Sequence, residues 1–196
     1  MRKKVHVLID GGHLRVLARK AKLNYDPELI EKVAHASTHP EDEELLRILY
    51  YDCAPYKGKV RLPVSGRLKE FQGSDRWLQD LASRDLFAVR HGELKFRGFK
   101  PKRIPVASDE LKDEDFRPDF EQKGVDMRIG LDIANFALTR SIDRIILISG
   151  DTDCIPAMKH CRISGLQVVL VAFPDWHPHR TLAHHADYVR RIEWPS

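Results

Sequence analysis

Residues 144–153 read RIILISGDTD, an apolar strand that runs directly into a Ser-Gly turn and two carboxylates. Residues 145–148 contain no polar side chain, which is typical of a strand covered by helices on both faces of a parallel sheet. Strand signals alternate with helix signals on either side of it, as in a doubly wound domain. The sequence therefore predicts an α/β fold in three layers, α/β/α, with a central, mostly parallel sheet.

Composition limits the class of protein further. The chain has 196 residues, of which 42% are hydrophobic and 32% are charged. This is enough for a sizeable core, and no apolar run approaches the roughly 20 residues of a membrane-spanning helix. We expect a single domain over residues 1–196 with no membrane partner. The apolar run 5–9 is too short for a signal peptide. Because Cys53, Cys154 and Cys161 form no CxxC pair, we expect a cytoplasmic location.

Element signals follow one another along the whole chain. The predicted strands are 5–9, 48–51, 87–89, 144–148 and 167–173, and the predicted helices follow the glycine turn at 11–12, cover 75–86 and 125–137, and lie between Pro156 and Gly165. A last short helix near 182–188 leads into residues 189–192. Glycine and proline mark residues 58–66 as a loop. Residues 98–124, rich in proline, lysine and acids, predict a mobile insertion or flap.

Four aspartates are expected to meet at one edge of the sheet. Asp10 ends the first strand and Asp151 and Asp153 follow the central one, so a parallel sheet brings them to its carboxyl edge, where ligands bind. Asp126 begins a helix beside its apolar stripe and is expected to face the sheet. Carboxylates held together raise one another's pKa unless a cation compensates them. Oxygen ligands suit a hard divalent ion, so the sequence predicts Mg²⁺ or Mn²⁺.

Asp132 is a second-tier candidate for the same metal site. Six residues separate it from Asp126, which rotates it by about 120° on an ideal helix. It borders the core face from the other side. The alternatives to a second metal are that it holds Lys123 or Arg128, or that it caps a neighbouring loop.

Basic and aromatic residues are interleaved in the middle of the chain. The formal net charge is +4, from 33 Lys and Arg minus 29 Asp and Glu. The basic residues are Lys57, Lys59, Arg61, Arg67, Lys69, Arg90, Lys95, Arg97, Lys100, Lys102 and Arg103, and the aromatic residues are Phe71, Trp77, Phe87, Phe96 and Phe99. This mixture favours a groove that follows a single-stranded nucleic acid. The alternative is a solvated loop face.

Histidine, cysteine and tryptophan residues in the C-terminal part have simpler interpretations. His177, His179, His184 and His185 lack a zinc-ligand pattern and are expected at the surface. Cys154 and Cys161 share one helix face and are expected to be buried. Trp176 and Trp194 are predicted to pack, or to form a self-association surface.

Four motifs resemble the NYN domains of LabA-like type, within the PIN-like nuclease superfamily. They are VLIDG at 7–11, Tyr50-Tyr51 with Pro55, KGVD at 123–126 with Asp132, and ILISGDTD at 146–153 with Pro156 and Gly165. The resemblance implies a PIN-like α/β fold and a metal-dependent ribonuclease that hydrolyses RNA phosphodiester bonds. It implies that Asp10, Asp126, Asp151 and Asp153 form the catalytic and metal-binding site.

Two positions depart from the family pattern. His13 stands where the family usually has Asn, and Cys154 stands where Phe is common. An imidazole can replace the amide as a donor to phosphate, and its charge is expected to titrate near neutral pH. His13, Lys123 and Arg128 are the candidates for binding RNA phosphates. The expected partner is single-stranded RNA, and a homodimer is a further expectation.

Other functions fit the same residues. A non-catalytic RNA- or nucleotide-binding regulatory module would use the acidic residues to hold one structural ion or to cap helices. A Toprim-like or phosphatase-like phosphotransfer domain would explain the Asp-Thr-Asp after a strand. It agrees less well, because a Toprim site requires Glu where Asp10 stands. Neither a nucleophile elbow nor a dinucleotide-binding glycine motif is present in the sequence.

Overall fold

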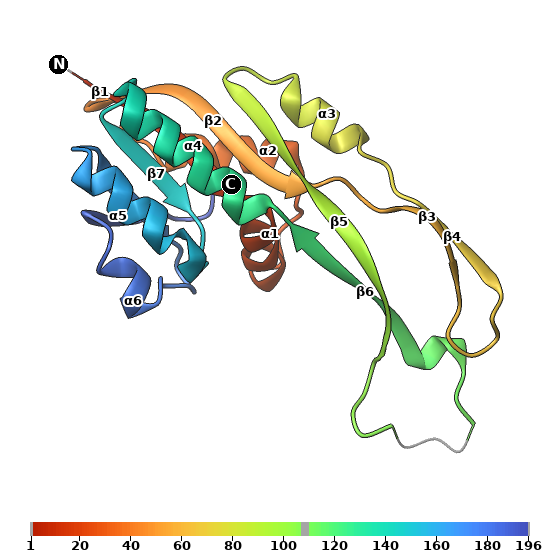
Figure 1. The fold of residues 1–196 in the computed structure, drawn as a ribbon. Coiled ribbons are helices and arrows are strands. Elements are labelled where there is room, and N and C mark those ends of the chain that lie inside the picture. The colour runs from red at the N-terminus through yellow and green to blue at the C-terminus, as the bar shows by residue number, and fades with distance from the viewer. Residues whose placement is uncertain (1, 107–109, 196) are drawn as a thin grey trace.

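A central sheet divides the protein into two helical layers (Figure 1). The computed structural model describes residues 2–106 and 110–195, and within these ranges the sheet has seven strands in the order β6-β5-β2-β1-β7-β8-β9. They are β1 (Lys3–Asp10), β2 (Glu43–Cys53), β5 (Phe87–Pro101), β6 (Phe116–Lys123), β7 (Arg144–Ile148), β8 (Gln167–Ala172) and β9 (Tyr188–Arg191). All neighbours are parallel except β5 and β6. The predicted α/β fold with a mostly parallel sheet is confirmed.

Helices cover both faces of this sheet. On one face lie α1 (Gly11–Lys20), α2 (Pro27–Ala36) and α3 (Arg76–Ala82), and on the other lie α4 (Val125–Thr139), α5 (Ile155–Ile163) and α6 (Arg180–Ala183). Successive strand residues point to opposite faces, so Val7 and Ile9 pack in the first core and Leu8 in the second. The buried residues of α4 are those on the predicted apolar face, at positions 125, 129, 133, 136 and 137.

Local capping signals explain where the helices near the site begin. The side chain of Asp10 accepts a hydrogen bond from the N–H of His13 at 3.0 Å and caps α1. Gly124 has φ +78°, a left-handed conformation that turns the chain from β6 into α4. Helix α2, for which the apolar pattern made no prediction, is capped by Asp26 and begins with Pro27.

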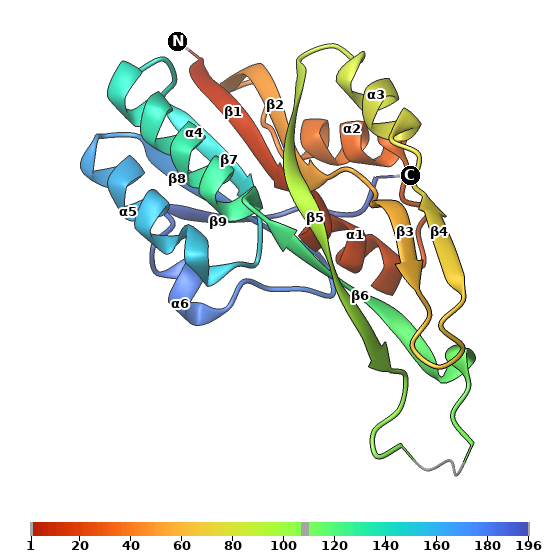
Figure 2. The ribbon, with the colours of Figure 1, turned by 45° about the vertical axis from the view of Figure 1, so that its right-hand side comes forward.

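The middle of the chain corrects the predicted loop and flap. Strand β5 continues to Pro101, well past the predicted 87–89, and pairs antiparallel with β6. Residues 98–101 and 116–123 of the predicted flap are therefore strand, and residues 107–109 lie outside the described residues. The predicted loop contains β3 (Lys57–Arg61), which pairs with β4 (Leu68–Gln72) in a separate sheet. We call the hairpin of β3 and β4 (residues 57–72) and the hairpin formed by the outer part of β5 with β6 (residues 93–101 and 116–123) the arm. Figure 2 shows both hairpins extending together away from the rest of the protein.

Aromatic packing holds the two hairpins of the arm together. Tyr56, Phe71, Phe96, Phe99 and Phe120 form a cluster with ring centroids 5.2 to 6.2 Å apart. Most of the aromatic side chains predicted as stacking platforms therefore contact one another, and Phe87 lies in the core. Several basic side chains of the arm form ion pairs at the surface, namely Lys57 with Asp75, Arg67 with Asp113, Arg97 with Glu121 and Lys100 with Asp119.

The structure confirms the predicted burial of the C-terminal cysteines and corrects the last helix, which covers Arg180–Ala183 and not 182–188. Cys154 and Cys161 are buried in the second core. Trp194 stacks on Phe173 with ring centroids 4.4 Å apart, so its role in packing is confirmed. No helix in the described part of the chain is long and apolar enough to span a membrane.

Candidate functional site

An acidic cleft opens where the chain reverses its direction across the sheet. From β1 the chain first builds β2 and β5 on one side, and later β7, β8 and β9 on the other. The carboxyl ends of β1 and β7 are therefore the switch point at which open α/β sheets bind ligands. The cleft there has a volume of about 600 Å³. Its lining residues are Asp10, Gly12, His13, Val16, Gln122, Val125, Asp126, Gly150, Asp151 and Thr152.

Ser149 connects the carboxylates that follow β1 and β7. Its hydroxyl donates to Oδ2 of Asp10 at 3.3 Å, and its Oγ accepts the N–H of Asp151 at 3.1 Å. Asp151 in turn accepts the N–H of Asp153 at 2.8 Å through Oδ1. These bonds leave the other oxygen of Asp151 directed to no partner among the described residues. The SGDTD turn thus orients two of the predicted carboxylates in the cleft.

Asp126 and Asp153 approach the cleft from the surface. Asp126 is exposed in the first turn of α4, which corrects the prediction that it faces the sheet, although it does line the cleft. Partial desolvation of its carboxyl and the negative charges of Asp151 and Asp153 raise the pKa of Asp126. Asp153 is exposed and does not line the cleft, but this electrostatic effect shows that it lies near Asp126.

The cleft has an excess of negative charge. Burial, and then the charges of Asp126 and Asp52, raise the pKa of Asp10, although hydrogen bonds from the His13 N–H and Ser149 oppose this effect. No lysine or arginine belongs to the described lining. Charge and donor type therefore suit a divalent cation. Within residues 2–106 and 110–195, however, no three side chains of His, Cys, Asp or Glu are close enough together to hold a metal ion as they stand.

His13 lies in the wall of the cleft against Trp176. The two rings make an edge-on contact with centroids 4.5 Å apart, which confirms packing as a role of Trp176. Nε2 of His13 is buried and has no hydrogen-bond partner in the described structure. Burial lowers the pKa of His13 to about 4, with a further contribution from Lys20. The imidazole is thus neutral at neutral pH, which corrects the expectation that its charge titrates there.

The remaining predicted residues lie outside the cleft. Lys123 pairs with Glu121 at 3.4 Å, and Arg128 is exposed on α4. Asp132 accepts hydrogen bonds from Tyr51 at 2.8 Å and from Arg90 at 3.0 Å, so neither predicted partner holds it. The structure does not bring Asp132 together with the other four aspartates. The exposed His177, His179 and His184 also belong to no metal cluster in the described chain.

Asp52 is a buried carboxylate beside the site that the motif analysis did not single out. It forms an ion pair with Arg15, and it accepts hydrogen bonds from Tyr50 at 2.9 Å and Gln122 at 3.1 Å. The sequence did contain a signal for it, because Asp52 directly follows a predicted strand, as Asp10 and Asp151 do. Arg15 and Gln122 have no such signal. They are brought to Asp52 by a helix and by the strand β6.

Comparison with known proteins assigns the class. The family model for the NYN domain matches residues 4–193. The chain therefore belongs to the NYN domain family, which is part of the PIN-like nuclease superfamily and whose members are generally nucleases.

Among solved structures, the protein is similar to a protein of unknown function, VPA0982, from Vibrio parahaemolyticus RIMD 2210633. The TM-score is 0.57 and the sequences are 19% identical, with 97% of this chain and 93% of the other covered. At this level of identity the similarity concerns the fold alone. No curated protein matches the sequence.

Proposed function

We propose that the protein is a metal-dependent ribonuclease that hydrolyses phosphodiester bonds of single-stranded RNA in the acidic cleft. The observation that carries this proposal is the convergence of Asp10, Asp126 and Asp151 on one cleft at the switch point of the sheet. Desolvation and the neighbouring negative charges raise the pKa of Asp10 and Asp126, and a bound cation would compensate these charges. Membership of a family of nucleases supports the same reaction.

Each residue of the cleft has a role in this proposal. Asp10, Asp126, Asp151 and the nearby Asp153 would hold Mg²⁺ or Mn²⁺, which would neutralise the phosphate and lower the pKa of a bound water. Ser149 keeps the carboxylate of Asp10 oriented. In-line attack of the water on phosphorus would break the bond to the 3′ oxygen and release 5′-phosphate and 3′-hydroxyl ends.

The contacts to RNA are part of the proposal as well. His13, as a neutral imidazole in the cleft wall, is a hydrogen-bonding group beside the phosphate. Lys123 and Arg128 flank Asp126 in the sequence and are exposed. Arg128 would contact the RNA strand as it enters the cleft, and Lys123 would exchange its pairing with Glu121 for a phosphate. Asp132 pairs with Arg90 outside the cleft and is not used as a metal ligand in this proposal.

The test is cleavage of a 5′-labelled single-stranded RNA with Mn²⁺, Mg²⁺ or EDTA. We expect cutting that requires the metal and is reduced by at least about a hundredfold in Asp151→Asn, since the carboxylate binds the ion directly. Asp85→Asn is the matched control, because Asp85 is an exposed aspartate in the turn before β5. Cutting that survives in Asp151→Asn would refute the assignment of the site.

The same experiment distinguishes the non-catalytic alternative. If the purified protein binds RNA but cuts none of several strands with either ion, the acidic cleft belongs to a binding module of the same fold. A folded Asp151→Asn protein that binds RNA as well as the wild type would then be expected. Circular dichroism of both proteins ensures that the comparison is made between folded molecules.

A further inference from the structure

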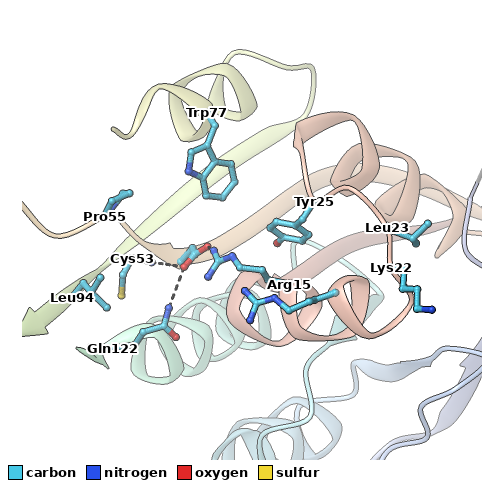
Figure 3. A pocket seen from close by; sticks show the side chains of 11 residues that line it. Arg15, Lys22, Leu23, Tyr25, Cys53, Pro55, Trp77, Leu94 and Gln122 are labelled. Carbon is cyan, nitrogen blue, oxygen red and sulfur yellow. Dashed lines mark hydrogen bonds and ion pairs between the residues drawn. The ribbon is translucent and has the colours of Figure 1, made fainter. Parts of the chain in front are cut away.

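A second pocket lies beside the acidic cleft and has the opposite charge. Its volume is about 720 Å³. Arg15 and Arg19 of α1, with Lys22 just after the end of the helix, form one wall. Arg15 and Arg19 are four positions apart, so they share one face of the helix. We call this cavity the basic pocket. Figure 3 shows Trp77 entering it from one side and Gln122 from the opposite side, with Tyr25 beside the helix.

Of the three basic side chains in the basic pocket, one is held by an ion pair and two have no ion-pair partner among the described residues. Arg15 is held by Asp52 and lies 5.4 Å from the ring centroid of Tyr25 and 5.9 Å from that of Trp77. Burial opposes the charge of Arg15, but the nearby Asp52 raises its pKa. Arg19 and Lys22 are exposed, and within the described part of the chain neither has an ion-pair partner. Two exposed positive charges without ion-pair partners suit a ligand with several negative charges better than a ligand with a single carboxylate.

The two cavities share a wall. Gln122 lines both, and it donates a hydrogen bond to Asp52 in the basic pocket at 3.1 Å. The helix α1 also lines both, with His13 and Val16 on the acidic side and Arg15 and Arg19 on the other. An RNA strand that passes through the acidic cleft would therefore reach the basic pocket next, because α1 and Gln122 line both cavities.

We infer that the basic pocket binds one nucleotide unit of the RNA strand next to the bond that is cut. Arg19 and Lys22 would bind its phosphate, and the base would pack against the aromatic and guanidinium surface of Trp77 and Arg15. The inference rests on the proposed function, because the strand in the cleft is the one that fills the pocket.

Binding in EDTA tests the pocket without cleavage. The probe is a fluorescein-labelled single-stranded RNA of ten nucleotides, followed by anisotropy at several salt concentrations. For Arg19→Gln/Lys22→Gln we expect about tenfold weaker binding and a slope of log K against log salt that is smaller by about 1.4, the value for two lost contacts on a single strand. The control Arg140→Gln/Lys159→Gln removes the same charge from positions outside both cavities and should bind as the wild type does.

Tryptophan fluorescence tests the position of the base. RNA should quench the emission of the wild type, and Trp77→Phe should lose most of this quenching while it still binds. If uridine 5′-monophosphate at the same concentration quenched the tryptophan emission as strongly as RNA does, the pocket would be one for a free nucleotide. The inference that it binds a unit of an RNA strand would then be overturned. Equal binding by the wild type and the Arg19→Gln/Lys22→Gln variant, or equal loss in the control, would overturn the pocket itself.

The outcomes for the pocket and for catalysis are separable. A protein that binds RNA through Arg19 and Lys22 in EDTA but never cuts it loses the proposed nuclease activity and keeps the pocket. A protein whose Asp151→Asn variant is inactive, but whose Arg19→Gln/Lys22→Gln variant binds and cuts as the wild type does, keeps the activity and loses the pocket.

Discussion

The hydroxyl of Ser149 donates a hydrogen bond to Oδ2 of Asp10 at 3.3 Å, and Ser149 is completely buried. The two residues follow adjacent parallel strands, since Ile9 pairs with Ile148. The bond therefore joins the two strand ends between which the acidic cleft opens. A serine at this position orients an acidic side chain without adding charge of its own.

Removing this hydroxyl should weaken both metal binding and folding. In Ser149→Ala, Asp10 and the N–H of Asp151 each lose a partner, at a cost of about 1–2 kcal/mol in the free energy of unfolding. We expect the metal concentration for half-maximal RNA cleavage to rise about tenfold, as for other residues that orient metal ligands. Ser83→Ala, which removes an exposed hydroxyl at the end of α3, should change neither value. An unaltered metal requirement in Ser149→Ala would contradict the positioning role.

Magnesium should stabilise the folded protein through the acidic cleft. At a concentration about ten times the dissociation constant, binding to the folded state alone adds about 1.4 kcal/mol, which raises Tm by about 3–6 °C for a chain of this size. Thermal denaturation with MgCl₂, compared with KCl at equal ionic strength, measures the shift. We expect it to disappear in Asp126→Asn/Asp151→Asn. A similar shift in that variant would place the ion elsewhere.

Two glycine-to-alanine substitutions should have opposite effects. A Cβ on Gly11 would come within 2.3 Å of the Tyr50 hydroxyl and 2.9 Å of the Asp52 carboxylate, both of them buried. Gly11→Ala should therefore destabilise the fold by about 2 kcal/mol or more. Gly130 lies in α4, and its Cβ would meet only Ala157 at 3.9 Å. Gly130→Ala should stabilise by about 0.5–1 kcal/mol in urea denaturation, because alanine favours the helix. Equal effects of the two would refute the steric argument.

Glu43 is the centre of a buried ionic network at the opposite end of the sheet. It accepts hydrogen bonds from Arg190 at 2.8 and 2.9 Å and from the N–H of His39 at 2.7 Å, and it also pairs with Arg144. Glu43→Gln leaves two nearly buried guanidinium groups without their charge partner. We expect a loss of about 3 kcal/mol in the free energy of unfolding at pH 7. Glu44→Gln, at the exposed neighbouring position, is the control.

The contribution of Glu43 should depend on pH in one direction. Burial raises the pKa of this carboxyl, but hydrogen bonds from Arg190, the His39 N–H and Arg144 outweigh it and lower the pKa to about 2. The stabilisation is therefore complete above the ordinary pKa of 4.5 and is lost as the pH falls from there towards 2. Urea denaturation of wild type and Glu43→Gln at pH 7 and pH 3 should show the difference between them shrinking at pH 3. A constant difference would exclude this linkage.

Loss of the aromatic cluster should loosen the arm and leave the central strands β1 and β7 unchanged. Phe96 contacts Tyr56, Phe71, Phe99 and Phe120, which come from both hairpins. In Phe96→Ala we expect faster amide hydrogen exchange at 57–72 and 116–123, because the hairpins lose their shared packing, with little change in β1 and β7. Leu68→Ala, at an exposed leucine of β4, should leave exchange unchanged. Faster exchange throughout the central sheet would mean that the arm is part of the core.

Much of the fold follows from local patterns. The apolar run of β7 predicts a parallel strand buried on both faces, and the periodicity of α4 predicts a helix buried on one face. The spacing of apolar residues differs between these two cases, so it can be read from the sequence. The arm did not follow from such patterns. Strand β3 and the outer part of β5 alternate half-buried and charged residues, but β4 and β6 do not. The aromatic rings of the arm pack on one another, and only the pairing of the two hairpins brings them together.

The candidate site divides in the same way. The position of Asp10 and Asp151 at the cleft was predictable, because each lies at the carboxyl end of a strand whose place in a parallel sheet brings that end to a known edge. The orientation of Asp126, the neutral state of His13 and the distant partners of Asp132 depend on burial and on neighbours from other elements. The basic pocket is the extreme case. Four different elements supply its residues Arg15, Asp52, Trp77 and Gln122. Only the packing of these elements against one another brings the four side chains to one pocket.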